Sequence, residues 1–126
     1  MSDSRRIFVV PGRPVPAVRM TQKSKFVDPA AQKYLSYKDL VGWTAKTEIK
    51  APILGDVVVT VILNFKQGRT GDIDNYVKSV LDGCNKIAWK DDRQVVELHA
   101  FRNKGRYDCQ EWAEVWIEEV GVGADV

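Results

Sequence analysis

The 126-residue sequence predicts an α+β domain in which a mixed β-sheet of about four strands carries two helices. Three observations lead to this class: apolar alternation near the middle of the chain, a two-faced helical pattern after it, and strand patterns near both ends. Because no linker or internal repeat interrupts them, residues 1–126 are expected to form one domain, with a frayed tail at residues 121–126.

The N-terminal part predicts a strand followed by an extended loop. The apolar run at residues 7–10 indicates a strand that ends at Pro11. Residues 11–29 hold four of the five prolines and show no periodicity, so they are expected to form an extended loop.

A first helix is predicted to follow this loop. Asp28 and Pro29 form a typical helix start, with an acid at the N-cap and proline in the first turn. The helix is expected to run to about Lys50, before Pro52, with Gly42 as a weak point.

The middle of the chain predicts a half-buried strand at residues 56–65. Five apolar residues alternate along one face of it: Val57, Val59, Val61, Leu63 and Phe65. Thr60 and Asn64 lie on the opposite face. This strand is expected to deliver the chain to Asp72.

Residues 74–88 predict a helix with two distinct faces. The polar face holds Asp74, Asn75, Lys78, Ser79, Asp82, Asn85 and Lys86. The apolar face holds Tyr76, Val77, Val80, Leu81, Cys84, Ile87 and Ala88.

Two strands, at residues 95–102 and 111–118, are expected to close the chain as a hairpin with Gly105 and Asp108 in its turn. The second strand should send Ala113, Val115 and Ile117 to the core. Trp112 and Trp116 would then lie on the other face, either under the first helix or in an interface between two copies of the chain. We favour the interface.

Composition excludes several classes of protein. No apolar run approaches the ~20 residues that a membrane span needs, and the N-terminus does not resemble a signal peptide. Two cysteines make neither a disulfide framework nor a zinc site, so a cytoplasmic location is expected. His99 receives no role, and no pattern indicates an organic cofactor.

The net charge of +2 is unevenly distributed. Residues 1–38 contain eight Lys or Arg against two Asp, whereas residues 108–126 contain six acids and no base. This segregation favours a basic surface that faces phosphate groups. The alternative is a solvated run of charge.

A group of charged residues indicates phosphodiester chemistry. Asp72 and Asp74 are one residue apart, Lys78 follows one helical turn later, and Asp91 and Asp92 form a second acidic pair. Carboxylates are the ligands that Mg²⁺ prefers, and a nearby lysine can stabilise charge on a phosphate. Simpler explanations exist for single members: Asp72 could cap the helix, and Asp74 could form a surface salt bridge with Lys78.

The pattern D-x-D-N-x-x-K-x-x-L-D resembles the RusA family of Holliday junction resolvases, together with the W-K-D-D-R-Q-V that follows at residues 89–95. In this chain the first pattern consists of Asp72, Asp74, Asn75, Lys78, Leu81 and Asp82. The two patterns cover about a fifth of the sequence, and the spacer between them is one residue shorter than in the best-known member.

The resemblance implies a small homodimeric endonuclease of phage or prophage origin that needs Mg²⁺, with Mn²⁺ as a substitute, and cuts four-way DNA junctions. Its catalytic residues would be Asp72, Asp74, Asp92 and Lys78, and Asp91 would be an additional metal ligand. The shortened spacer leaves open whether Asp91 or Asp92 is the principal third ligand. A two-fold dimer would match the two-fold symmetry of a junction.

The proline-rich loop and the turn after the middle strand are expected to contact DNA, the loop becoming ordered against it. The contact residues would be Arg13, Arg19, Lys23, Lys25 and Arg69.

Other functions stay open at this point: a non-catalytic module that binds branched DNA, or a nuclease that prefers flaps or forks. A calcium regulator fits less well, because a twelve-residue calcium loop starting at Asp72 would need glycine and glutamate where the chain has Val77 and Gly83.

Overall fold

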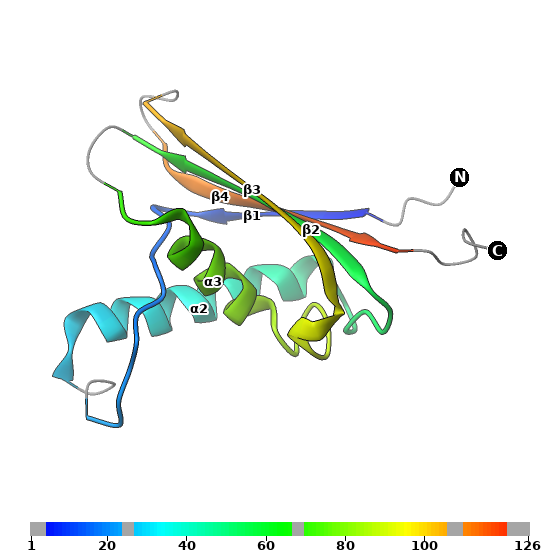
Figure 1. Ribbon diagram of the computed structural model, residues 1–126, viewed down its shortest axis with the longest axis horizontal. Helices are drawn as coiled ribbons and strands as arrows, with labels where there is room; N and C mark the ends of the chain where they lie inside the picture. Colours follow the sequence, from blue (N-terminus) through cyan, green and yellow to red (C-terminus); the bar gives the residue numbers. More distant parts are fainter. Residues whose placement is uncertain (1–4, 24–26, 67–69, 106–109, 121–126) are drawn as a thin grey trace.

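The computed structural model describes residues 5–23, 27–66, 70–105 and 110–120. Its elements are β1 (Arg5–Pro11), α2 (Pro29–Glu48), β2 (Val57–Phe65), α3 (Ile73–Cys84), the short 3-10 helix η1 (Asp92–Gln94), β3 (Val95–Lys104) and β4 (Trp112–Glu119) (Figure 1). The predicted α+β class and the element order are confirmed. The predicted tail at residues 121–126 and the turn residue Asp108 lie outside the described residues.

The four strands form one mixed sheet in the order β1-β4-β2-β3. β4 pairs antiparallel with β1 and β2, whereas β3 runs parallel to β2. The predicted hairpin of the last two strands is therefore wrong, because β2 lies between them. β2 is the most apolar strand, and as a buried strand it needs backbone partners on both sides.

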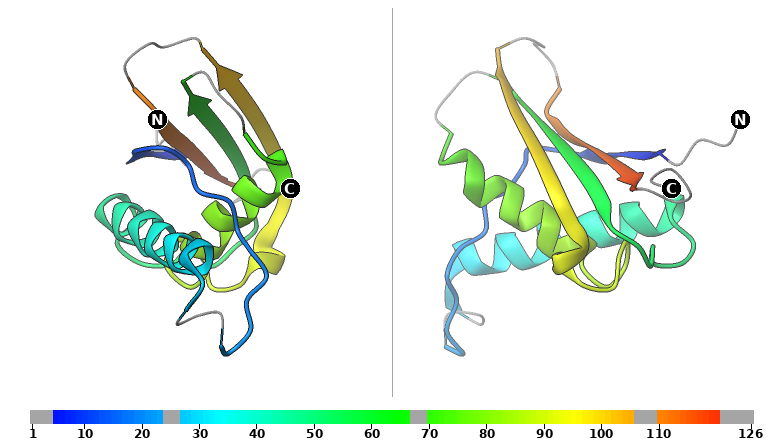
Figure 2. Two further views of the ribbon diagram at one scale, coloured as in Figure 1. Left: turned by 90° about the vertical axis from the view of Figure 1, so that its left-hand side faces the viewer. Right: turned by 45° about the vertical axis from the view of Figure 1, so that its right-hand side comes forward.

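Both helices lie on one face of the sheet, and the core fills the space between (Figure 2). The predicted alternation of β2 is confirmed, since its five apolar residues are at most 1% exposed. Ala113, Val115 and Ile117 of β4 are fully buried beside them, as predicted. Asn64 projects from the opposite face of β2 and accepts a hydrogen bond from Asn103 Nδ2 at 2.9 Å.

The outer face of the sheet carries no helix in the part of the chain that the structure describes (Figure 2). Trp112 and Trp116 alternate with the core residues of β4 and are half-buried on this outer face, so the alternative that they pack under the first helix is wrong. Trp116 Nε1 donates to Glu114 Oε2 at 2.7 Å, and Arg5 lies 5.3 Å above the Trp116 ring. An interface at these tryptophans stays a prediction.

The start of α2 matches the prediction, since the Asp28 carboxylate accepts a hydrogen bond from Ala30 N at 2.9 Å. The helix is continuous through Gly42, which is buried where α2 meets α3. A Cβ at Gly42 would lie 2.8 Å from Ile87 Cδ1, and one at Gly83 of α3 would lie 2.6 Å from Val41 Cβ. The two glycines let the helices approach closely, so Gly42 is a packing position.

α3 is shorter than predicted and has a wider buried face. It ends at Cys84, and Lys86 has a positive φ of 70°, so residues 85–88 form a turn. Ser79, predicted on the polar face, is fully buried and donates to Val15 O at 2.6 Å. Ala17 N also donates to Asn75 O at 2.9 Å. The N-terminal loop (residues 12–23) is thus hydrogen-bonded to α3 at two points.

Candidate functional site

The segment that leads into α3 is held by hydrogen bonds to both backbone groups of Gly71. Gly71 N donates to the Tyr76 hydroxyl at 3.1 Å, and Arg102 of β3 donates to Gly71 O. The same guanidinium lies 3.3 Å from Thr70 Oγ1. These contacts place Asp72 at the N-terminus of α3.

Asp72 and Asp74 stand at this N-terminus with exposed side chains. Asp72 occupies the N-cap position, but its side chain makes no capping hydrogen bond. The capping explanation for this residue is therefore not realised. A carboxylate here is still favoured by the positive end of the helix dipole, which lowers the cost of holding two acids together.

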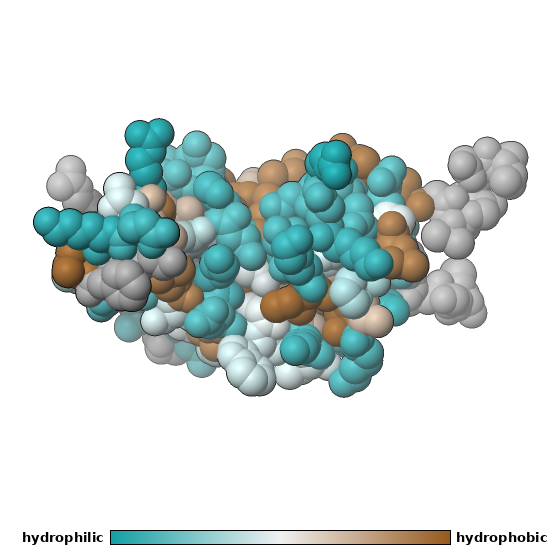
Figure 3. Space-filling view, turned by 90° about the horizontal axis from the view of Figure 1, so that it is seen from below, coloured by the Kyte–Doolittle hydropathy of each residue, from teal (hydrophilic) through white to brown (hydrophobic). Residues whose placement is uncertain are grey.

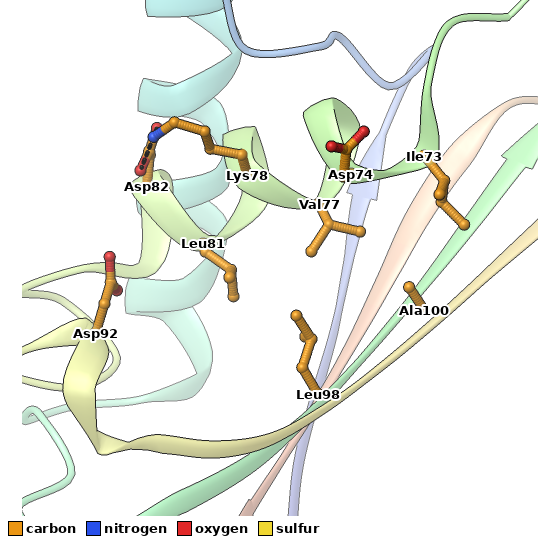
Figure 4. Close-up of a pocket in the computed structure, with 9 residues that line it drawn as sticks. All are labelled: Ile73, Asp74, Val77, Lys78, Leu81, Asp82, Asp92, Leu98 and Ala100. Atoms are coloured by element: carbon orange, nitrogen blue, oxygen red, sulfur yellow. Dashed lines mark hydrogen bonds and ion pairs between the residues drawn. The ribbon is translucent and has the colours of Figure 1, made fainter.

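A cavity of about 380 Å³ lies between α3 and β3 (Figure 4). Four charged residues line it: Asp74, Lys78 and Asp82 from α3, and Asp92 from η1. The rest of the wall is apolar and consists of Ile73, Val77, Leu81, Leu98 and Ala100. The structure therefore brings four of the charged residues of the sequence pattern to one cavity, but leaves Asp72 and Asp91 outside its lining.

Lys78 pairs with Asp82 and points away from Asp74 (Figure 4). Its Nζ lies 3.2 Å from Asp82 Oδ2, and Asp82 also accepts a hydrogen bond from the hydroxyl of Tyr34 on α2. Burial and this hydrogen bond raise the pKa of Tyr34 well above its ordinary value, so it remains a donor. The two contacts hold the lysine along the helix, and the salt bridge of Asp74 with Lys78 is replaced by one with Asp82.

Asp92 and Asp91 have different surroundings. Asp92 Oδ1 accepts a hydrogen bond at 2.8 Å from Nε1 of Trp89, which is fully buried, so its carboxylate is held at the cavity. Asp91 caps η1 by accepting from Arg93 N at 2.8 Å, and Gln94 completes a capping box. The Arg93 hydrogen bonds lower the pKa of Asp91 below its ordinary value.

The donors suit Mg²⁺ in kind, but one chain does not bring three of them together. Among the described residues, no group of three or more acidic, histidine or cysteine side chains is arranged to hold a metal ion. Asp74 and Asp82 are eight residues apart on α3, which is about 12 Å along the axis. Asp92 lies at the Asp82 end of the cavity (Figure 4). The set of Asp72, Asp74 and Asp92 is thus split between the two ends of α3.

The basic residues predicted to contact DNA fall into three groups. Arg19 and Lys23 are exposed on the N-terminal loop. Arg13 is engaged within the protein, since it lies 2.6 Å from Glu111 Oε2 and 5.1 Å above the Phe65 ring. Lys25 and Arg69 lie outside the described residues.

The surface seen from the side of the helices is mostly hydrophilic, with small hydrophobic spots (Figure 3).

None of the helices in the described ranges is long and apolar enough to cross a membrane. Cys84 is fully buried, as its place on the apolar helix face predicted.

Three residues that shape this site, Tyr34, Asp82 and Arg102, received no role from the sequence. Asp82 carries a readable signal, because it is part of the motif and lies on the polar face one turn after Lys78. Tyr34 and Arg102 carry no such signal, since their contacts join segments more than thirty positions apart.

Fold and cavity together define a small α+β domain with a site lined by carboxylates and a lysine, a class of site suited to chemistry on phosphate groups. A family model described as endodeoxyribonuclease RusA matches residues 11–118. The chain therefore belongs to the RusA endodeoxyribonuclease family, which confirms the resemblance and indicates endodeoxyribonuclease activity.

A curated relative supports the extent of this match. The chain is 33% identical over 134 aligned residues to a protein of Bacillus subtilis (strain 168) that carries the name uncharacterized protein YqaN. The alignment covers 89% of this chain and 90% of that protein. The similarity thus extends over nearly the whole length of both proteins.

Proposed function

We propose that this protein is a Mg²⁺-dependent, structure-selective endodeoxyribonuclease that resolves four-way DNA junctions by paired symmetric cuts, acting as a homodimer in the cytoplasm. The observation that carries the proposal is the cavity between α3 and β3, where Asp74, Lys78 and Asp92 of the family motif meet. Family membership over residues 11–118 supports DNA as the substrate.

Asp72, Asp74 and Asp92 are the proposed ligands of the metal, with Mn²⁺ as a substitute for Mg²⁺. Since α3 separates Asp92 from the other two acids within one chain, the proposed homodimer would have to bring the two halves of the ligand set together. A bound divalent ion would neutralise charge on the scissile phosphate and lower the pKa of a bound water. Of the acidic pair, Asp92 is the better ligand, because it lines the cavity whereas Asp91 is engaged in capping η1. Asp91, which lies outside the lining of the cavity, is proposed to tune the site or to hold a second ion.

Lys78 is the proposed phosphate-directed cation. An ammonium group has three donors, and Asp82 leaves part of this capacity for a phosphate oxygen. Asp82 and Tyr34 restrict the lysine, whose free side chain would lose about 2 kcal/mol of rotamer entropy on being fixed. The lysine is thus oriented before the substrate arrives.

The N-terminal loop supplies part of the proposed DNA contact. Arg19 and Lys23 are exposed on it, and the loop is hydrogen-bonded through Val15 and Ala17 to α3, the helix that carries Asp74 and Lys78. Lys25 and Arg69 remain proposed contacts on their sequence positions. Arg13 is proposed as a contact that also ties the loop to β4 through Glu111.

The test is cleavage of a labelled synthetic four-way junction beside a flap, a fork and a linear duplex of the same sequence, with Mg²⁺, with Mn²⁺ and with EDTA. We expect paired symmetric nicks in the junction that need the metal and spare the duplex. Tight junction binding without cutting under any divalent metal would support a binding module instead. Faster cutting of flaps or forks would keep the nuclease and change its substrate.

A further inference from the structure

Resting on the proposed function, we infer that the end of β3 is a contact for the DNA backbone beside the N-terminus of α3. Arg102 binds one phosphate group and at the same time holds the segment that carries Asp72. Lys104 binds a neighbouring phosphate of the same DNA strand. The ligand of this surface is thus a sugar-phosphate backbone, and neither residue belongs to the sequence motif.

The first step is the row of side chains along β3. Alternate residues of a strand lie on the same face of a sheet. Leu98 and Ala100 line the cavity with α3, so Arg102 and Lys104 continue the same row. Figure 4 shows Ala100 at the end of the cavity that is away from Asp92. The row therefore changes from apolar to cationic where it leaves the cavity at this end.

The second step is the position of Arg102. Its Nη1 donates to Gly71 O and lies 3.3 Å from Thr70 Oγ1. Both groups belong to the segment that leads directly to Asp72. The guanidinium thus lies at the N-terminus of α3 and joins the proposed metal ligand to the edge strand of the sheet.

The third step is the binding capacity that this guanidinium keeps. It has five N–H donors, of which only two are on Nη1, so the two contacts leave three donors on Nε and Nη2. Within the described ranges, Arg102 forms no salt bridge with a carboxylate, unlike Arg13 and Arg93. A planar guanidinium with parallel donors suits a phosphate group, and the contacts at Nη1 fix its plane before DNA binds.

The fourth step is charge. The two acids at the N-terminus of α3 repel a phosphate, so nearby cations are needed to hold the DNA backbone against this repulsion. Arg102 and Lys104 are exposed, and so is Lys66, which follows the sheet partner of Lys104 on β2. The carboxyl ends of the parallel strands β2 and β3 thus gather three cations (Figure 1). Arg102 and Lys104 are about 7 Å apart along the strand, so they reach two different phosphates.

The alternative is a purely structural role. Arg102 would then tie the Asp72 segment to the sheet without touching DNA, and Lys104 would be a solvated surface lysine. This alternative predicts that neither residue changes the salt dependence of DNA binding.

The first arm of the test measures binding without cutting. A labelled four-way junction is titrated in EDTA at several salt concentrations and followed by fluorescence anisotropy. The slope of log affinity against log salt concentration should lose about one unit of magnitude in Lys104→Gln, and about two in the double variant with Arg102→Gln. Lys50→Gln is the matched control, because Lys50 is exposed after α2, far from the end of β3 (Figure 1), and its slope should equal that of wild-type protein.

The second arm tests the hold of Arg102 on the Asp72 segment, in protein without metal or DNA. Amide hydrogen exchange of residues 70–76, measured by mass spectrometry, should be faster in Arg102→Gln and unchanged in Lys104→Gln. Arg102→Lys, which keeps the charge, should restore most of the salt slope. Circular dichroism verifies that each variant is folded.

The outcomes separate the inference from the proposed function. If wild-type protein binds the junction but cuts no DNA structure, the proposed nuclease fails, and the salt slopes still judge the contact at β3. If wild-type protein cuts but the double variant keeps the full slope, or loses no more than Lys50→Gln, the inference is overturned. Unchanged exchange of residues 70–76 in Arg102→Gln would overturn the positioning role of Arg102.

Discussion

The contact between α2 and α3 positions the cavity, and Gly83→Ala perturbs it with a single methyl group. A Cβ at Gly83 would lie 2.6 Å from Val41 Cβ, 2.7 Å from Val41 Cγ1 and 2.8 Å from Lys38 O. Ordinary contacts of this kind begin at 3.4 Å. One of the three atoms belongs to the backbone of α2, so a side-chain rotation cannot relieve the overlap and the helices must separate.

Two effects of opposite sign set the magnitude. Alanine is favoured over glycine in a helix by at most about 1 kcal/mol, and less in the last turn, where Gly83 lies. Overpacking of a tight contact costs about 1–3 kcal/mol, and a backbone clash belongs to the upper end of that range. We therefore expect Gly83→Ala to lower the free energy of unfolding by about 1–2 kcal/mol. For a chain of this size the melting temperature should fall by about 4–8 °C.

The assay is thermal and urea unfolding followed by circular dichroism, with Gly55→Ala as the matched control. Among the described residues, no atom outside the two neighbours in the chain lies within 4 Å of a Cβ at Gly55, so that substitution should be neutral or stabilise by up to about 1 kcal/mol. Equal melting temperatures for the two variants would refute the close helix contact. A fall confined to Gly83→Ala would support it, and a smaller cleavage rate should accompany the shift of α3.

Three further contacts are tested by single substitutions, two of them with a matched control. Tyr34→Phe should lower the free energy of unfolding by about 1–2 kcal/mol, because it removes the hydrogen bond to Asp82. Tyr37→Phe on the same helix should not lower it, because the buried Tyr37 hydroxyl has no hydrogen-bond partner among the described residues. Chemical denaturation compares the two variants. Asp28→Ala removes a helix cap and should lower the free energy of unfolding by about 1 kcal/mol, whereas Asp72→Ala should lower it by less than about 0.5 kcal/mol. Equal losses of stability in the two variants would contradict the absence of a capping hydrogen bond at Asp72. Ser79→Ala should speed amide hydrogen exchange in the N-terminal loop, and unchanged protection would show that its hydrogen bond to that loop is unimportant.

The fold was predictable where local patterns decide it. The alternation along β2 reports a single buried face, and the Asp28 cap is a short-range signal. The pairing of β3 was not predictable in this way. The composition of the loop near Gly105 favours a hairpin of β3 with β4, whereas β2 lies between these two strands and pairs with both. That arrangement depends on the whole sheet and not on the local sequence. The burial of Ser79 depends on where the N-terminal loop passes, which helical periodicity does not record.

The site was predictable in its residue types and less so in its geometry. Asp74, Lys78 and Asp92 were predicted as site residues, and the three side chains line one cavity. The pairing of Lys78 with Asp82 depends on Tyr34 from another helix, so spacing alone could not choose between the two acids. The order of residues in the motif also does not reveal that α3 separates Asp72 and Asp74 from Asp92.

We propose that the acids at the N-terminus of α3 serve catalysis and not DNA binding. The most direct measurement compares Asp74→Ala with wild-type protein for junction binding and junction cleavage under identical conditions, with Asp39→Ala, an exposed acid on α2, as the control. An active-site carboxylate repels phosphate, so we expect Asp74→Ala to bind the junction at least as tightly while cleavage is lost. Full cleavage by a folded Asp74→Ala protein, or loss of binding together with cleavage, would contradict this catalytic role.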